Sequence, residues 1–391
     1  MSADRWLLPD AVADILPPEA ERIESLRRCM IDRFYGWGYQ LVMPPLLEYL
    51  ESLLSSASHD LDLQTFKVTD QLSGRTMGLR ADITPQAARI DAHRLREDGI
   101  TRLCYVGDVL HTKPATITSQ RNPIQVGAEL YGHGGIESDA EVVSLMLDVL
   151  AVAGVNDAIL GLGHVGIYRS LATAAALSEE QECELFDALQ RKAVTEINAF
   201  VVEHVTDKSL ASMLKQLPGL CGGASVLTQA KAVFADAPEA VKAALAELEN
   251  TANVITQRCK VEPTFDLAEL RGYHYHTGVV FSAYIQGESK AVAQGGRYDS
   301  IGEAFGRARP ATGFSADLIT LANCSDESYS VPAGIAAPVV QDEQLWSLIS
   351  QLRAQGERVI ESLSDQADDS ALSGCNRKIV NQQGQWQVVK L

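Results

Sequence analysis

Two neighbouring stretches decide the fold: RLCYVGDVL at residues 102–110 and NPIQVGAELY at residues 122–131. Both are rich in the β-branched and aromatic residues that favour strands. The polar loop at residues 111–121 separates them. We therefore expect them to form two strands, and the rest of the chain can be assigned outward from this pair.

The segments around this pair alternate between hairpin and helix patterns. Residues 65–70 and 76–80 flank Ser73-Gly74-Arg75, which predicts a hairpin. Further strand patterns lie at residues 264–267, 277–285 and 291–294. Helices are expected at residues 19–35, 83–98, 142–152 (opened by a capping box at Ser138–Glu141) and 313–324, and in an Ala- and Leu-rich insertion at about residues 173–255. Because the strands cluster as hairpins, the sequence predicts an α+β fold with a largely antiparallel sheet flanked by helices.

The length of 391 residues corresponds to about two to three domains. Residues 325–334 are polar and contain Pro332 and Gly334, which is typical of a linker. We therefore expect a core at residues 1–324 and a small C-terminal segment at residues 335–391. An αβ unit is predicted in that segment, around residues 342–362.

Charge and composition narrow the classes of function. The net charge of −18 disfavours nucleic acid as the main partner, although plain solubility is an alternative explanation. The sequence contains no run of about 18 apolar residues, so no membrane span is predicted, and its first residues lack a signal pattern. The seven cysteines are scattered without a CxxC motif, which argues against a disulfide framework. These features predict a cytoplasmic protein with no membrane partner.

Two local patterns have competing interpretations. The hexapeptide GLGHVG at residues 161–166 matches the dinucleotide fingerprint, but helical patterns follow where a second parallel strand is needed. We interpret it as a strand-to-helix joint, with dinucleotide binding as the alternative. His274 and His276 would share one face of a strand, yet no third metal ligand stands at a recognisable spacing. Hydrogen bonding in a polar pocket is the favoured interpretation, and no metal or cofactor is expected.

Seven short motifs follow one another in a fixed order over roughly residues 5–324. They are GWGY leading to PPLLE (36–48), LRADITP (79–85), RLCYVG (102–107), QVGAELYG (125–132), LRGYHY (270–275), QGGRYD (294–299) and PATGFS (310–315). In this order they resemble the class II aminoacyl-tRNA synthetase core, specifically that of histidyl-tRNA synthetase. The resemblance implies an antiparallel sheet flanked by helices and a homodimer formed through the first motif.

The resemblance also implies a pocket for the amino acid histidine. Its residues would be Asp82, Thr84, Gln125, Glu129, Arg271, Tyr275 and His276. An amino acid needs carboxylates for its ammonium group, a cation for its carboxylate and hydrogen-bonding partners for its imidazole. Arg271 is the only permanent cation in this set, so we expect it to pair with the ligand carboxylate. Asp82 stands where the family has Glu, and His276 where it usually has Tyr; each residue taken singly is also explained as an ion pair or a satisfied core polar group.

The chain departs from the synthetase pattern where ATP would bind. Leu110-His111 replaces an aromatic residue followed by an arginine, Thr320 replaces a second arginine, and Asp317 replaces a small residue. Losing two cations and adding a carboxylate should abolish ATP activation, because such charges commonly carry a large share of catalysis. We therefore expect no catalytic residues. Arg121 remains as a possible vestigial nucleotide or anion site.

The C-terminal segment departs as well, because residues 335–391 are too short for the synthetase's anticodon-binding domain and are acidic at residues 365–369. The combination resembles the family of ATP phosphoribosyltransferase regulatory subunits. This implies a non-catalytic, hetero-oligomeric partner that binds no tRNA. It would activate a short catalytic subunit and mediate histidine inhibition at the first step of histidine biosynthesis. An active histidine–tRNA ligase and a solitary amino-acid-binding module are the alternatives.

Overall fold

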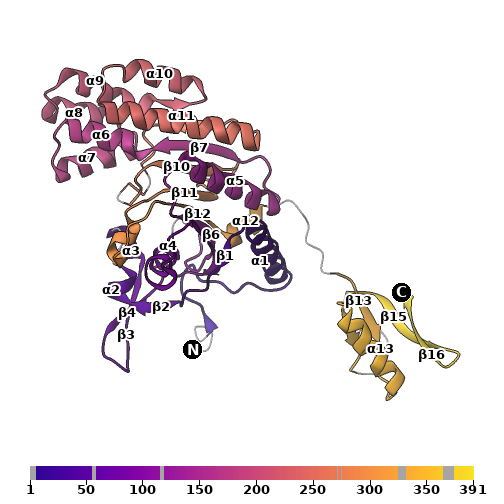
Figure 1. Cartoon of the computed structure of the whole chain (residues 1–391). Coiled ribbons are helices and arrows are strands. Elements are labelled where there is room, and N and C mark those ends of the chain that lie inside the picture. Colours follow the sequence, from indigo (N-terminus) through magenta and orange to yellow (C-terminus); the bar gives the residue numbers. More distant parts are fainter. Residues whose placement is uncertain are drawn as a thin grey trace. The chain divides into compact units, whose positions relative to one another are not determined.

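The structure is a computed structural model, and it describes residues 6–54, 59–114, 119–270, 272–273, 275–324, 332–363 and 374–391. Two residues of the sequence analysis, Arg271 and His274, lie outside the described residues. The chain divides into two units, Met1–Glu327 and Ser328–Leu391, and each is described by itself (Figure 1). Most of the predicted linker also lies outside the described residues, so the predicted domain boundaries stay predictions.

A nine-stranded sheet forms the centre of the first unit. In sheet order its strands are β1 (Gln40–Leu41), β5 (Thr101–Asp108), β6 (Ile124–Tyr131), β12 (Ala311–Asp317), β11 (Ala293–Arg297), β10 (Val279–Tyr284), β7 (Ile159–His164), β9 (Thr264–Asp266) and β8 (Cys221–Gly222). Only the β1–β5 and β7–β9 pairings are parallel among these described strands. The α+β fold with a largely antiparallel sheet is therefore confirmed, and β5 and β6 are the antiparallel pair predicted first.

Three helices cover the sheet and close its core. Helix α1 (Glu19–Gly36) buries Ile23, Met30 and Phe34, which share one helical stripe. It packs against α5 (Ile136–Val152) and α12 (Leu318–Cys324). The apolar side chains of these helices and of the central strands belong to one continuous hydrophobic core.

The predicted helical insertion is present beyond β7. Its helices are α6 (Val165–Ala174), α7 (Glu179–Gln190), α8 (Val194–His204), α9 (Lys208–Gln216), α10 (Ser225–Val233) and α11 (Glu239–Cys259). Figure 1 shows these helices gathered at one end of the sheet, where α11 packs against both α5 and α6. In the described part of the chain, no helix combines the length and apolarity that a membrane span requires.

A three-stranded sheet lies in the N-terminal part of the same unit. It consists of β2 (Leu47–Tyr49), β4 (Thr76–Leu79) and β3 (Phe66–Thr69), with the short helices α2 (Leu50–Leu53) and α3 (His59–Gln64) between β2 and β3. The antiparallel β3–β4 pair confirms the predicted hairpin. The helix predicted over residues 83–98 is α4 (Thr84–Arg89), which continues as a π-helix over Ile90–Leu95.

Two local predictions were wrong. Helix α5 begins at Ile136, so Ser138 lies inside its first turn and does not cap it; the Ser138 hydroxyl instead bonds the carbonyl oxygen of Gly135 at 2.7 Å. Residues 313–317, predicted as the start of a helix, lie in strand β12 (Ala311–Asp317), and only Leu318–Cys324 are helical. Residues 311–317 form a strand because they pair with β6 and β11, which are distant from them in sequence.

The C-terminal unit has its own sheet and its own small core. Strands β14 (Val359–Glu361), β13 (Gly334–Ala337), β15 (Cys375–Gln382) and β16 (Gln385–Lys390) lie in this order, and helix α13 (Glu343–Ala354) buries Leu345 and Ile349. The predicted αβ unit corresponds to α13 and β14. The β15–β16 hairpin was not predicted, and the acidic run at residues 365–369 lies outside the described residues.

Candidate functional site

A cavity of about 710 Å³ brings most of the predicted pocket together. Asp82 and Thr84 from the start of α4, Glu129 from β6, and Tyr275 and His276 from the segment before β10 all line it. Gln125 lines a neighbouring cavity, and Arg271 lies outside the described residues. The helical insertion also contributes, because the end of α7 supplies Phe186, Asp187 and Gln190 to the cavity wall.

Glu129 is the most deeply buried charged group of this cavity, at 1% exposure. The Tyr105 hydroxyl donates to Glu129 Oε1 at 2.9 Å, and Thr84 Oγ1 lies 3.1 Å from the same Tyr105 oxygen. Glu129 Oε2 receives no hydrogen bond from any described residue. The carboxylate is thus held through one oxygen and leaves the other available to a donor.

Two glycines make this arrangement possible. Tyr105 on β5 stands opposite Gly127 on β6, and a Cβ atom at Gly127 would lie 2.5 Å from the Tyr105 hydroxyl. Glu129 stands opposite Gly313 on β12, where a Cβ atom would overlap Glu129 Oε2. The QVGAELYG and PATGFS motifs therefore place glycines where the side chains of the pocket need space.

The electrostatics of the cavity follow from this burial. Burial raises the pKa of the Glu129 carboxyl group well above its usual range, and the Asp82 carboxylate raises it further. Hydrogen bonds from Tyr105 and Thr84 act in the opposite direction. A cationic or N–H-donating ligand next to Oε2 would supply the missing partner of a desolvated carboxylate.

Asp82 and Gln125 hold one another. Asp82 Oδ1 accepts hydrogen bonds from the Thr84 backbone N–H at 2.9 Å and from Gln125 Nε2 at 2.7 Å. Gln125 Oε1 accepts in turn from the Ile83 backbone N–H at 2.8 Å. Gln125 therefore fixes the turn at residues 82–84 rather than facing the first cavity itself.

Tyr275 and His276 enter the cavity side by side. Their ring centroids are 4.2 Å apart, and His276 is 5% exposed. The turn before them depends on Gly272, which has a φ of +66° and would place a Cβ atom 2.5 Å from His276 Nδ1. A side chain at position 272 would therefore collide with the imidazole.

The second cavity, of about 930 Å³, contains the positions where the chain departs from the synthetase pattern. Thr320 Oγ1 donates to Asp317 Oδ2 at 2.7 Å, and the Ile319 N–H donates to Asp317 Oδ1 at 3.1 Å. Asp317 thus caps the start of α12. His111 Nε2 lies 2.9 Å from the Ala81 carbonyl oxygen. The three polar side chains among the replacements, those of His111, Asp317 and Thr320, are thus hydrogen-bonded within the protein itself.

Arg121 is bound to backbone oxygens near this cavity. Its Nε donates to the His111 carbonyl oxygen at 3.0 Å and its Nη1 to that of Asp10 at 3.4 Å. Its guanidinium also lies 5.0 Å from the ring centre of Phe66. Arg121 is not among the described residues that line either cavity, and an anion site there stays a prediction.

Two pocket residues were missed. Tyr105 is fully buried and orients Glu129, and Tyr298 lines the cavity with a buried hydroxyl that no described residue bonds. Both lie inside motifs that the sequence analysis quoted. Tyr298 follows Arg297 in QGGRYD and lines the cavity, whereas Tyr105, opposite Gly127, does not line it and acts on the pocket through Glu129.

The two ambiguous motifs now have a structural explanation. GLGHVG is a strand-to-helix joint in which His164 ends β7 and accepts a hydrogen bond from the Gly166 N–H at 3.0 Å. β7 pairs antiparallel with β10, and its parallel neighbour β9 follows only after the whole helical insertion, so the joint does not open the compact βαβ unit of a dinucleotide site. Within the described residues, no group of three or more His, Cys, Asp or Glu side chains is placed to hold a metal ion.

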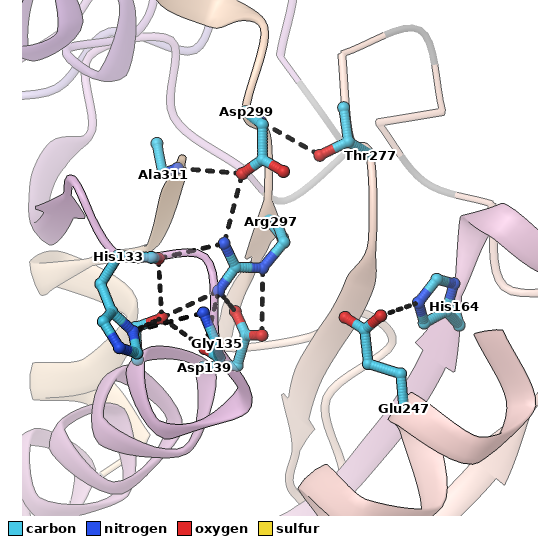
Figure 2. A network of polar contacts seen from close by, with 10 residues as sticks. His133, Gly135, Asp139, His164, Glu247, Thr277, Arg297, Asp299 and Ala311 are labelled. Carbon is cyan, nitrogen blue, oxygen red and sulfur yellow. Dashed lines mark hydrogen bonds and ion pairs between the residues drawn. The ribbon is translucent and has the colours of Figure 1, made fainter. Parts of the chain in front are cut away.

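A buried arginine explains the QGGRYD motif. Figure 2 shows Arg297, 3% exposed, paired with Asp139 at 3.0 Å and with Asp299 at 3.2 Å. It also donates to Ser138 Oγ at 2.8 Å. Asp299 accepts from the Ala311 N–H at 3.0 Å. This network joins β11, β12 and α5 directly behind the pocket.

Comparison with known proteins identifies the family. The model of the histidyl-tRNA synthetase family matches residues 11–321, and the model of the C-terminal domain of the ATP phosphoribosyltransferase subunit HisZ matches residues 332–389. The ATP phosphoribosyltransferase regulatory subunit of Azotobacter vinelandii is 55% identical over 100% of this chain and 99% of its own length. That of Ectopseudomonas mendocina is 54% identical with the same coverage.

Solved structures agree with this fold. A crystal structure of an ATP phosphoribosyltransferase regulatory subunit/histidyl-tRNA synthetase from Bacillus halodurans C is 28% identical, covers 95% of this chain and 97% of its own, and has a TM-score of 0.83. Histidyl-tRNA synthetase from Nostoc sp. is 17% identical over 98% of this chain and 97% of its own, with a TM-score of 0.77, which supports the fold alone. Together with the full-length relatives, these similarities show that the chain belongs to the family of ATP phosphoribosyltransferase regulatory subunits, which confirms the predicted family and the predicted role as a regulatory rather than a catalytic subunit.

Proposed function

We propose that this chain binds free histidine in the 710 Å³ cavity and transmits its presence to a catalytic ATP phosphoribosyltransferase subunit. The observation that carries the proposal is Glu129 Oε2, a buried carboxylate oxygen at the cavity wall with no donor among the described residues. A buried polar group without a partner is costly, so its retention points to a ligand that supplies one.

The other residues of the site complement the remaining groups of histidine. Asp82 and Glu129 would hold the ammonium or the imidazole, and Thr84, Tyr275 and His276 would complete the hydrogen bonds. Gln125 would act through Asp82. Arg271 would pair with the ligand carboxylate, as the resemblance to the synthetase pocket implies.

The second cavity supports binding without ligation chemistry. Asp82, Glu288 and Asp317 line it beside Lys290, so carboxylates outnumber the cation where a triphosphate would need positive charge. Thr320, which stands where the synthetases have an arginine, is hydrogen-bonded to Asp317 and supplies no positive charge. This arrangement supports a sensor that does not bind ATP.

The first motif supports a homodimeric core. Its segment exposes a set of large apolar side chains that a second copy of the chain would cover: Leu41, Met43, Leu46, Leu47 and Tyr49. Met43 is 73% exposed, beside the edge strand β1.

All seven cysteines lie among the described residues and are free thiols, as expected in the cytoplasm, where we place the assembly.

Titration calorimetry with histidine tests the site. We expect Arg271→Ala to weaken binding roughly 30- to 5000-fold, because it leaves a ligand carboxylate unpaired at a cost of about 2–5 kcal/mol. Glu129→Ala should weaken it in the same direction. Glu196→Ala is the matched control, because Glu196 pairs with Arg191 on the exposed surface of the insertion. Unchanged affinity in both pocket variants would remove the cavity as the histidine site.

Mixing the chain with a short catalytic ATP phosphoribosyltransferase tests the partnership. We expect a complex by light scattering, a mass consistent with a dimeric regulatory core, faster transfer, and inhibition by histidine that Arg271→Ala relieves without loss of activation. No complex and no change in rate at micromolar concentrations would contradict the partnership. Histidine-dependent ATP–pyrophosphate exchange by the chain alone would favour the ligase instead.

A further inference from the structure

The segment that carries Tyr275 and His276 is held from two sides. We call residues 270–277 the pocket loop; its positions 271 and 274 lie outside the described residues. At its C-terminal end, the Thr277 N–H donates to the Arg297 carbonyl oxygen at 2.7 Å, and Thr277 Oγ1 accepts from the Asp299 N–H at 3.0 Å. Figure 2 shows Thr277 linked to Asp299 and Asp299 linked to the buried Arg297, so this end of the loop is anchored to the Arg297 network.

The other side is held by the helical insertion through Arg169 on α6. Its Nη2 donates to the Tyr273 carbonyl oxygen at 2.8 Å and to the His276 carbonyl oxygen at 3.0 Å. Its guanidinium lies 4.8 Å from the centre of the Tyr273 ring. One cationic side chain thus holds two carbonyl groups of the loop, those of Tyr273 and His276.

Tyr273 ties the same loop to α6 and α7. It is 6% exposed, and its ring centroid lies 5.3 Å from those of both Tyr168 and Phe186. Its hydroxyl donates to the Glu182 carboxylate. Phe186 itself lines the histidine cavity, so α7 contacts both the loop and the ligand space.

From these contacts we infer that Arg169 is a positioning residue of the ligand pocket. By fixing the carbonyl groups of Tyr273 and His276, it sets the direction in which Tyr275 and His276 project into the cavity. It also makes helices α6 and α7 sensitive to whether the cavity is filled. This inference rests on the proposed function, because it assigns the cavity to histidine.

The chemistry of the contact dictates the test variants. A guanidinium presents several fixed N–H donors, whereas a lysine ammonium is a point charge on a flexible stem. Arg169→Ala removes the contact, and Arg169→Lys retains the charge with poorer geometry. Arg191→Ala is the matched control, since Arg191 lies on the same insertion and its exposed pair with Glu196 does not touch the loop.

The experiment combines calorimetry with hydrogen-exchange mass spectrometry on the full chain. We expect Arg169→Ala to weaken histidine binding about 10- to 100-fold, because two charge-assisted hydrogen bonds that shape the site are lost. Arg169→Lys should be intermediate, and Arg191→Ala should match the parent. In the parent, histidine should slow amide exchange in peptides covering residues 165–190 and 270–277. In Arg169→Ala, the loop peptide should exchange faster without ligand, and histidine should no longer protect residues 165–190.

Each outcome has a defined meaning. If the parent binds no histidine, the proposed function falls before Arg169 is tested. If the parent binds histidine and Arg169→Ala binds it equally well, with unchanged exchange in the loop, the inference is overturned while the site stands. If Arg169→Ala does not fold, Arg169→Lys decides, and parental affinity together with parental exchange in that variant overturns the inference. Equal weakening by Arg191→Ala also overturns it.

Discussion

Glu129 is placed where a carboxylate destabilises the folded protein unless a ligand is present. It is buried, one of its oxygens has no donor among the described residues, and Asp82 lies close enough to raise its pKa further. A core optimised only for stability would place a neutral or apolar group there. Under the proposed function, the carboxylate is a binding group, and bound histidine would offset the cost of burying it.

This cost predicts a pH-dependent gain in stability for Glu129→Gln. The folded-state pKa is raised, so between the ordinary glutamate pKa of about 4.3 and the raised value, the folded state retains a proton that the unfolded state has lost. Over that window the free energy of unfolding of the parent falls as pH rises. Glutamine does not titrate, so the difference in free energy of unfolding, in favour of Glu129→Gln over the parent, should grow with pH and then level off.

Thermal or urea unfolding of both proteins across this pH window, without histidine, measures the difference. Glu196→Gln serves as the control, because Glu196 is an exposed carboxylate paired with Arg191. Glu129→Gln should also lose histidine affinity. A variant that is less stable than the parent at neutral pH would show that the ionised carboxylate stabilises the fold, contrary to the argument.

The sequence groups residues that the structure brings together, but it does not give their contacts. Asp82, Thr84 and Glu129 are predicted to bind histidine; they line one cavity, and their binding of histidine stays a prediction. Gln125 and Tyr105 act through other residues, because a side chain's role depends on which strand lies opposite. Tyr105 needs Gly127 across the β5–β6 pair, and no pattern within either strand contains that information.

At the scale of elements, helices and hairpins with strong local patterns were predictable. Helix α1 and the β3–β4 hairpin follow their sequence patterns closely. Helix α5 begins earlier than predicted, at Ile136, and the Ser138 hydroxyl bonds both the Gly135 carbonyl oxygen at the helix start and Arg297, 159 positions away. A capping pattern describes only what a serine can do locally, and a buried arginine offers a stronger partner.

The same reasoning explains β12 and the C-terminal hairpin. Ala311–Asp317 form a central strand because β6 and β11 flank them, and Gly313 gives Glu129 its space. The β15–β16 turn uses Gln383 and Gly384, both at positive φ. Glycine suits that geometry but glutamine rarely adopts it, so the hairpin gave only a weak signal.

At the scale of the whole molecule, each unit has its own hydrophobic packing. The core of the first unit includes the strands and helices around the pocket, whereas the core of the second is built from Ile335, Leu345, Ile349, Val359 and Ile379. All described residues of the histidine cavity belong to Met1–Glu327. Histidine binding should therefore stabilise Met1–Glu327 directly and leave the stability of Ser328–Leu391 unchanged.

Urea unfolding followed by pulse-labelling hydrogen exchange should resolve two transitions, one for peptides of each unit. Histidine at 100 times its dissociation constant should stabilise the first unit by about 2.7 kcal/mol and leave the midpoint of Ser328–Leu391 unchanged. Leu345→Ala, at a fully buried position, should cost the second unit about 2–5 kcal/mol without moving the first. A single transition, or an equal histidine shift in both units, would mean that the second unit is coupled to the ligand. The C-terminal unit would then belong to the sensor itself.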